Sequence, residues 1–170
     1  ISSTPSSFNP ETRDQIVINS VKFLLKQERR QAASDMLDKN LARLNDVGRV
    51  LDLSKFLSDQ GMNSSADAAQ THAINQAKTI NELLQLARFF EEGTDYDKAT
   101  SALKRAAGLS KSGNDLVAVL KLSAKLNRDE IVDELIETSL PRVASSFEEQ
   151  VPVLDALMEL GRREEATQMI

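Results

Sequence analysis

Residues 79–110 read TINELLQLARFFEEGTDYDKATSALKRAAGLS, and this stretch decides the fold. Leu and Ala recur at helical spacing on both sides of Gly93, which predicts two amphipathic helices joined by a turn. Thr79 followed by Glu82 is a typical helix start, because hydroxyl and carboxylate can each accept a bond from a free backbone N–H of the first turn. The stretch therefore predicts a helical hairpin.

The same pattern returns every 33 residues along the chain. One column of small or branched apolar residues keeps this period, with a slip of one residue before its last member: Ala33, Ala66, Ala99, Val132 and Ala166. Two further columns share the register: Phe23, Phe56, Phe89 and Leu122, and Leu24, Leu57 and Phe90. Such a period indicates stacked hairpins, since no single hairpin can bury its own apolar face. We expect the Phe column to lie in the core between repeats rather than to form an aromatic binding site.

Five helix pairs account for the chain beyond residue 9, and residues 10–170 are predicted to form one all-α domain. The first helices are expected at approximately 10–27, 46–60, 80–93, 113–126 and 147–160. The second helices are expected at approximately 29–44, 64–78, 96–110, 129–140 and 162–170. Gly61, Gly93, Asn127 and Gly161 separate paired helices and tolerate the left-handed conformation that ends a helix. Pro152 leaves open whether the fifth first helix starts near Gln150 or is kinked, and residues 1–9 form a flexible lead-in.

The composition limits the function. The net charge of -5, the single Tyr and the absence of Trp speak against nucleic-acid binding. No apolar run is long enough to span a membrane, and the absence of Cys excludes disulfides and Cys-ligated metals. The start at Ile1 and an end inside a helical pattern predict that the chain is a piece of a longer protein.

The third unit resembles the tetratricopeptide repeat (TPR), a helix–turn–helix unit of about 34 residues. Its matching positions are Leu86, Ala87, Phe90, Tyr96, Ala99, Leu103 and Ala106, and residues 160–166 resemble the turn and second helix of the family. Other units depart from the pattern: Val21, Leu120 or Leu154 replaces the usual Gly or Ala, and Ser123 replaces the aromatic residue. The resemblance covers residues 13–170. It implies a right-handed α-solenoid of about five antiparallel hairpins, with a concave groove lined by the first helices, that serves protein–protein binding.

A basic ladder in the same register is the best candidate binding surface. Its members are Lys22, Lys55, Arg88 and Lys121, and Asp155 interrupts it in the last unit. Each follows an aliphatic residue by four positions, so the aliphatic set forms a neighbouring stripe: Ile18, Leu51, Leu84 and Val117. If these helices line a groove, it suits a protein or peptide segment with acidic and hydrophobic residues. The alternative is that the basic side chains are merely solvated, with their stems covering apolar neighbours.

Other polar groups are weaker candidates for a site. Two acidic groups are interpreted as solvated turn residues: Glu91, Glu92, Asp95 and Asp97, and Asp129, Glu130, Asp133 and Glu134. His72 is the only histidine, and no nucleophile motif or Gly-rich phosphate loop accompanies it. We therefore expect no catalytic, cofactor or metal site and no enzyme. The alternative functions are a structural, self-associating or regulatory spacer of a larger protein, and a homo-oligomer that stacks through uncapped helix ends is compatible with the sequence.

Overall fold

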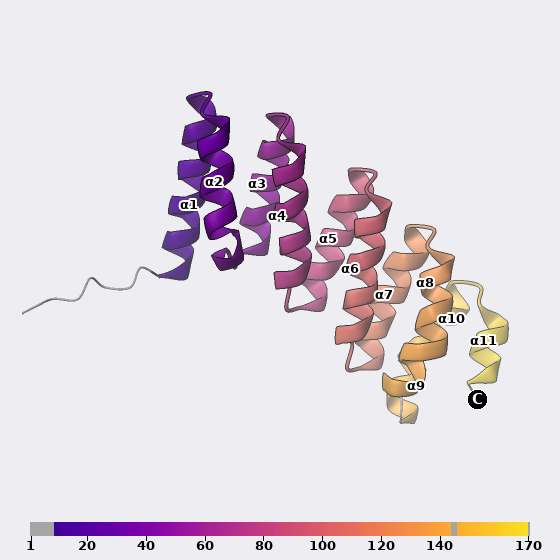
Figure 1. Ribbon diagram of the computed structural model, residues 1–170. Helices are drawn as coiled ribbons and strands as arrows, with labels where there is room; N and C mark the ends of the chain where they lie inside the picture. The colour runs from indigo at the N-terminus through magenta and orange to yellow at the C-terminus, as the bar shows by residue number, and fades with distance from the viewer. Residues whose placement is uncertain (1–8, 144–145, 170) are drawn as a thin grey trace, which may run out of the picture. The chain divides into compact units, whose positions relative to one another are not determined.

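The computed structural model describes residues 9–143 and 146–169 (Figure 1). All regular structure within these ranges is helical, which confirms the all-α prediction. The chain splits into two compact units, residues 1–77 and 78–170, which we describe separately. The continuous solenoid expected over residues 10–170 stays a prediction. Of the predicted lead-in at residues 1–9, residues 1–8 lie outside the described ranges and Asn9 caps α1.

Unit 1 consists of two helical hairpins (Figure 1). Its elements are α1 (Pro10–Lys26), α2 (Arg30–Asn40), the short 3₁₀ helix η1 (Leu41–Arg43), α3 (Val47–Asp59) and α4 (Asn63–Gln76). Helix α1 pairs with α2 and α3 pairs with α4, while α1 also contacts α3. The predicted second helix 29–44 therefore changes from α to 3₁₀ geometry over its last turn.

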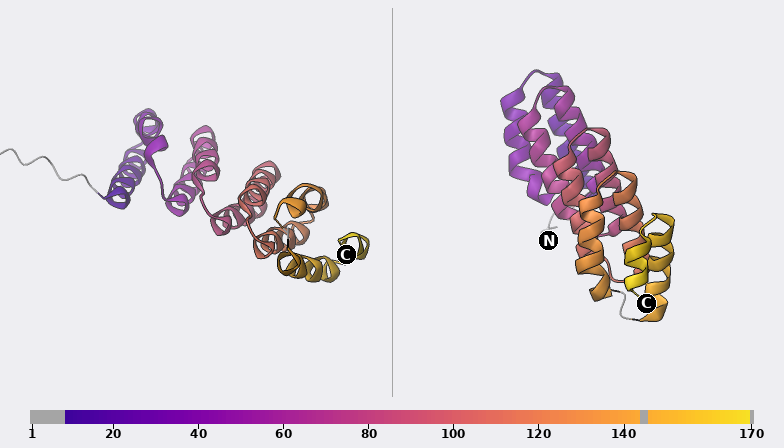
Figure 2. Two further views of the ribbon diagram at one scale, coloured as in Figure 1. Left: turned by 90° about the horizontal axis from the view of Figure 1, so that it is seen from below. Right: turned by 90° about the vertical axis from the view of Figure 1, so that its right-hand side faces the viewer.

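Unit 2 contains three further hairpins (Figure 2). Its elements are α5 (Ile80–Glu92), α6 (Tyr96–Leu109), α7 (Gly113–Lys125), α8 (Asp129–Glu134), the π-helix η2 (Leu135–Ser139), α9 (Leu140–Val143), α10 (Phe147–Glu159) and α11 (Arg163–Gln168). Helix α5 pairs with α6 and α10 pairs with α11, while α7 packs against both α8 and α10. The π-helix and α9 extend the predicted helix 129–140 by three residues, into the stretch around Pro141.

The predicted start signals do act as caps. The Thr79 and Ser112 hydroxyls each accept the backbone N–H of the acid three residues on, at 3.2 Å, and both capping boxes are complete. Ser146 caps α10 in the same way, so this helix begins at Phe147 and the alternative start near Gln150 is wrong. Pro152 is accommodated inside α10, in its second turn.

The left-handed turn residues are mostly those expected. Gly61, Gly161 and Asn127 have positive φ angles of 71°, 78° and 54°. The prediction is wrong for Gly93, whose φ is -81°. Thr94 takes the left-handed conformation instead, with φ 59°, because it follows the C-cap as Gly61 and Asn127 do, 33 residues from each of them.

The repeating columns differ in burial. The small-residue column is buried throughout, with exposed fractions of 0–3%. The core assignment of the Phe column is wrong for Phe23, which is 61% exposed, whereas Phe56 and Phe89 are half-buried. In unit 1 the side chain of Lys22, on α1, lies over the Phe56 ring of α3. Phe23 lies on the first helix of its unit, where no earlier described helix can cover it in this way.

Candidate partner-binding site

The unit 1 half of the basic ladder lies on α1 and α3. Lys22 is half-buried, with its Nζ 5.5 Å from the centre of the Phe56 ring, a cation–π contact that holds the ammonium over the aromatic face. Lys55 is exposed and makes no hydrogen bond or ion pair with any residue that the structure describes. Unit 1 therefore presents one partly engaged cation and one free cation.

The unit 2 half of the ladder shows the same division. Arg88, on α5, is exposed and has no polar partner within the described part of the chain. Lys121, on α7, forms an ion pair with Glu159 of α10, with 2.6 Å between Nζ and Oε2. Both side chains of this pair are about half exposed, so water screens the attraction and its contribution to stability is small.

The aliphatic stripe beside the ladder is largely buried. Ile18 and Leu84 are 3% and 6% exposed, so both serve the packed core and offer almost no surface to a partner. Leu51 and Val117 are half-buried and remain partly accessible. The structure thus reduces the accessible apolar part of the predicted site to one residue in each unit, and the binding assignment of the set stays a prediction.

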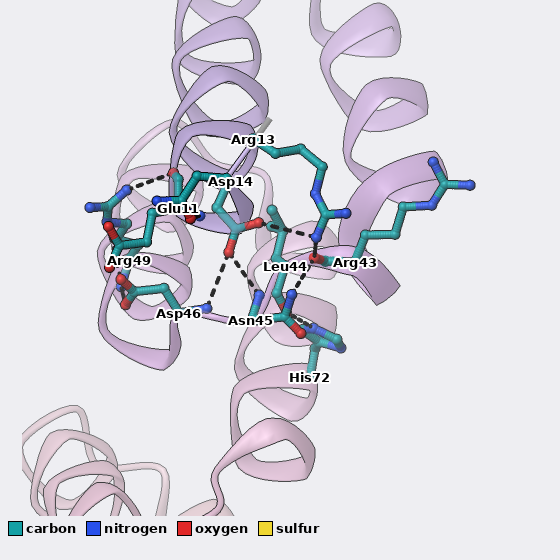
Figure 3. Close-up of polar contacts among 10 residues, drawn as sticks. Glu11, Arg13, Asp14, Arg43, Leu44, Asn45, Asp46, Arg49 and His72 are labelled. Atoms are coloured by element: carbon teal, nitrogen blue, oxygen red, sulfur yellow. Dashed lines mark hydrogen bonds and ion pairs between the residues drawn. The ribbon is translucent and has the colours of Figure 1, made fainter. Parts of the chain in front are cut away.

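A buried polar cluster in unit 1 was missed by sequence reasoning (Figure 3). Asp14 of α1 is 1% exposed, and its Oδ2 accepts the backbone N–H groups of Asn45 at 2.8 Å and Asp46 at 3.2 Å. Arg13 donates to the carbonyl of Arg43 at 2.7 Å. A possible signal was the charge of Asp14 at a repeat position that is otherwise apolar or Gly.

His72 belongs to the same cluster (Figure 3). Its Nε2 lies 2.8 Å from the carbonyl oxygen of Leu44, and Arg49 donates to the carbonyl of Glu11 at 3.0 Å. Together with the Asp14 bonds, these contacts fasten the connection between η1 and α3 to α1 and α4. The side chains of this cluster are engaged in hydrogen bonds with the backbone, so the cluster stabilises the fold of unit 1.

The acidic turn residues do more than face solvent, which corrects the solvated interpretation for several of them. Glu91 forms an ion pair with Arg128 at 2.7 Å, and the Arg128 guanidinium lies 4.7 Å from the centre of the Tyr96 ring. Asp133 forms an ion pair with Arg162. These pairs connect successive hairpins of unit 2, because each joins the turn region of one hairpin to an acid of the hairpin before it.

Two further acids also have partners. Asp95 accepts the Lys98 backbone N–H at the start of α6 and pairs with the Lys98 ammonium at 2.7 Å. Burial raises the pKa of the Asp95 carboxyl, but the bonds from Lys98 outweigh it and leave the pKa below its usual value. Glu134 pairs with Lys104 at 2.7 Å. The described residues contain no group of three or more Asp, Glu or His side chains placed to hold a metal ion.

A hollow of about 450 Å³ opens between α6 and the η2–α9 segment of unit 2. Its walls include Lys104, Leu135, Thr138 and Arg142. Arg142 donates to two carbonyls at the end of α6, those of Ser110 at 3.2 Å and Ala107 at 3.0 Å. Lys104 is paired with Glu134, so both cations of this hollow are engaged in contacts within unit 2.

Comparison of the chain with protein-family models, with curated proteins and with solved structures found no match. Among the residues that the structure describes, no helix has both the length and the apolar character needed to cross a lipid bilayer.

Proposed function

We propose that this chain is a protein-interaction module that binds a partner segment on the exposed faces of its first helices. The observation that carries the proposal is the state of Lys55 and Arg88. Both are exposed cations without a polar partner in the described chain, and Lys55 lies one helical turn from the partly accessible Leu51. Cations held beside apolar surface attract a segment that carries both carboxylates and apolar side chains.

The other two ladder residues support the same partner chemistry. The Lys121–Glu159 pair is exposed, and pairs of this kind contribute only about 0–1 kcal/mol, so a partner carboxylate can replace Glu159 at little cost. Lys22 keeps its ammonium over Phe56, where a partner carboxylate can still reach it. The accessible apolar contacts are Leu51 in unit 1 and Val117 in unit 2.

The test uses the whole chain and a synthetic amphipathic helical peptide. The peptide carries Leu at i, i+3 and i+4 spacing along one face of the helix and Glu along the neighbouring face. Binding is followed by fluorescence anisotropy of the labelled peptide. The variant Lys55→Glu/Arg88→Glu reverses one free cation in each unit. The matched control Lys39→Glu/Lys125→Glu changes the net charge equally at two other exposed lysines.

We expect the ladder variant to bind the peptide about tenfold or more weakly than the control, because like charges then face the peptide carboxylates. Circular dichroism should show the same helicity for both variants, as all four positions are exposed. Equal affinity of the ladder variant and the control would remove the basic ladder from the proposed function.

A further inference from the structure

The exposed large hydrophobic side chains gather on two helices. Among the described residues, those on α1 are Ile16 and Phe23, which are 48% and 61% exposed. Those on α10 are Phe147, Val151 and Met158, which are 74%, 37% and 52% exposed. The one other exposed large hydrophobic side chain, Tyr96, lies under the guanidinium of Arg128. The apolar surface on α1 and α10 therefore needs its own explanation.

Contacts between successive first helices start from the same repeat position, that of Lys22 and Lys121, in both units. In unit 1, Lys22 of α1 reaches the Phe56 ring on the following first helix, α3. In unit 2, Lys121 of α7 reaches Glu159 on the following first helix, α10. Each first helix thus uses one side to meet the hairpin after it and another side to meet the hairpin before it.

A second contact in unit 2 fixes the register at the other end of the helices. The carboxylate of Glu149, on α10, accepts the backbone N–H of Gly113 at the start of α7. An added Cβ on Gly113 would clash with the Glu149 carbonyl oxygen, so the two helices approach very closely at this point. The α7–α10 contact is therefore defined by two residue pairs, Lys121 with Glu159 and Gly113 with Glu149.

The same register identifies what α10 offers to a hairpin after it and what α1 offers to a hairpin before it. On α10, Phe147 occupies the repeat position of Gly113 and Asp155 that of Lys121. On α1, the positions of Glu149 and Glu159 are occupied four repeats earlier by Ile16 and Lys26. A junction between α10 and α1 would thus pair Phe147 with Ile16 and Asp155 with Lys26.

Both of these pairs are complementary. Phe147 and Ile16 are apolar and exposed, so their contact removes apolar surface from water. Asp155 and Lys26 carry opposite charges, and both are exposed without a polar partner among the residues described. In Lys121–Glu159 the earlier helix carries the positive charge, whereas at this junction α10 carries the negative charge of Asp155 and α1 the positive charge of Lys26. The pairing is therefore specific to this junction.

We propose that a second copy of this chain docks head to tail, with the α10 face of one copy on the α1 face of the other. The α10 face consists of Phe147, Val151, Leu154, Asp155 and Met158. The α1 face consists of Ile16, Ser20, Phe23 and Lys26, and a hollow of about 390 Å³ opens between Phe23 and Met36. The two faces differ, so the contact is heterologous.

Ser20 limits the strength of this contact. The inner hairpins carry buried apolar residues at the equivalent position: Leu53, Leu86 and Val119. Ser20 is only half-buried and removes less apolar surface than these residues do. We therefore expect weak, concentration-dependent association, which Ser20→Leu should tighten.

The test is sedimentation velocity of the whole chain from about 1 μM to 1 mM, the range in which weak complexes form. Lys26→Glu and Asp155→Lys should each lower the association constant about tenfold, because each places like charges at the junction. The double variant Lys26→Glu/Asp155→Lys should restore association, since it exchanges the charges. Lys39→Glu, an exposed lysine outside both faces, should behave like the original chain.

A sedimentation coefficient that is independent of concentration over this range would overturn the proposal. So would association that the single charge reversals do not weaken, that the double variant does not restore, or that Ser20→Leu does not tighten. Lys26→Glu and Ser20→Leu separate this result from the peptide-binding test, because neither residue occupies a ladder position, whereas Asp155 stands at the ladder position of the last unit.

Discussion

A carboxylate buried away from water needs hydrogen bonds that replace those it gave up to solvent, and Asp14 finds them in the backbone of the η1–α3 connection. Its Oδ2 accepts the N–H groups of Asn45 and Asp46 at the entrance to α3. Both donors precede the first turn of α3, which is capped separately by Asp46. One side chain on α1 therefore fixes where the second hairpin of unit 1 begins.

Asp14→Ala should lower the free energy of unfolding by about 2–3 kcal/mol, since it leaves two backbone donors without their charged acceptor. Urea titration followed by circular dichroism measures this change. Asp38→Ala, at an exposed position of α2, is the control and should stay within about 0.5 kcal/mol of the original chain. Equal stability of the two variants would show that the Asp14 bonds contribute nothing.

Glu82 gives a pH-dependent contribution at the start of α5. Burial raises the pKa of its carboxyl. Hydrogen bonds from the Lys78 and Thr79 backbone N–H groups and from the Thr79 hydroxyl together lower the pKa by more, so the net pKa is below the usual value. A lowered folded-state pKa stabilises the fold above the unfolded-state pKa. This stabilisation is lost as the pH falls through the folded-state value.

Glu82→Gln should therefore cost about 0.5–1 kcal/mol at neutral pH, through loss of the charged cap at a helix N-terminus. The difference from the original chain should shrink as the pH falls through the lowered folded-state pKa, below which the carboxyl is protonated in both states. Urea titrations at several pH values measure it. Glu92→Gln, at the other end of α5, should show no such loss, and a constant difference across the pH range would contradict the assignment.

At the scale of elements, two glycines in helices have opposite surroundings. Gly113 begins α7 and has no room for a side chain, because an added Cβ would clash with the Glu149 carbonyl oxygen on α10. Gly108, in the last turn of α6, has no atom within 4 Å of its added Cβ. Close packing of α7 on α10 thus depends on the first glycine and not on the second.

The two Gly→Ala substitutions should consequently change stability in opposite directions. Gly113→Ala forces α7 and α10 apart, and overpacking of this kind costs about 1–3 kcal/mol. Gly108→Ala should stabilise by about 0.5–1 kcal/mol, since Ala has the higher helix propensity and meets no clash. Thermal unfolding of both variants compares them directly, and a stabilising Gly113→Ala would refute the close contact.

At the scale of the whole molecule, the division at residues 77 and 78 separates two sets of internal contacts. Each unit has its own buried residues, such as Leu37 and Leu57 in unit 1 and Leu103 and Leu120 in unit 2. Regions of a protein that share few contacts open independently of one another. Local unfolding is therefore expected to follow the units.

Gly113→Ala should accelerate amide hydrogen exchange mainly within residues 78–170, because the α7–α10 contact belongs to unit 2. Hydrogen exchange followed by mass spectrometry on proteolytic fragments resolves the two units. Asp14→Ala serves as the reciprocal variant and should act mainly on residues 9–77. A loss of protection spread equally over both units in either variant would show that the chain opens as one cooperative unit.

The sequence by itself determined the helices and where they begin, because helical periodicity and N-capping are local properties, whereas the ends of the second helices predicted at 29–44 and 129–140 differ. The Thr79, Ser112 and Ser146 caps start α5, α7 and α10 at the predicted places. The left-handed residue after α5 is Thr94 and not Gly93, because the position is set by the 33-residue repeat that it shares with Gly61 and Asn127.

Tertiary structure alone decided which repeated residues are covered and which polar groups meet. The period gave Phe23 and Phe56 the same place in their hairpins, but only the neighbouring helix determines that Phe56 is half-buried and Phe23 exposed. Likewise, Asp14 meets Asn45 and Asp46 across about one repeat of chain. Helix formation depends on local sequence, whereas burial and long-range hydrogen bonds depend on how neighbouring helices pack. The tertiary structure therefore decides which side chains are left at the surface.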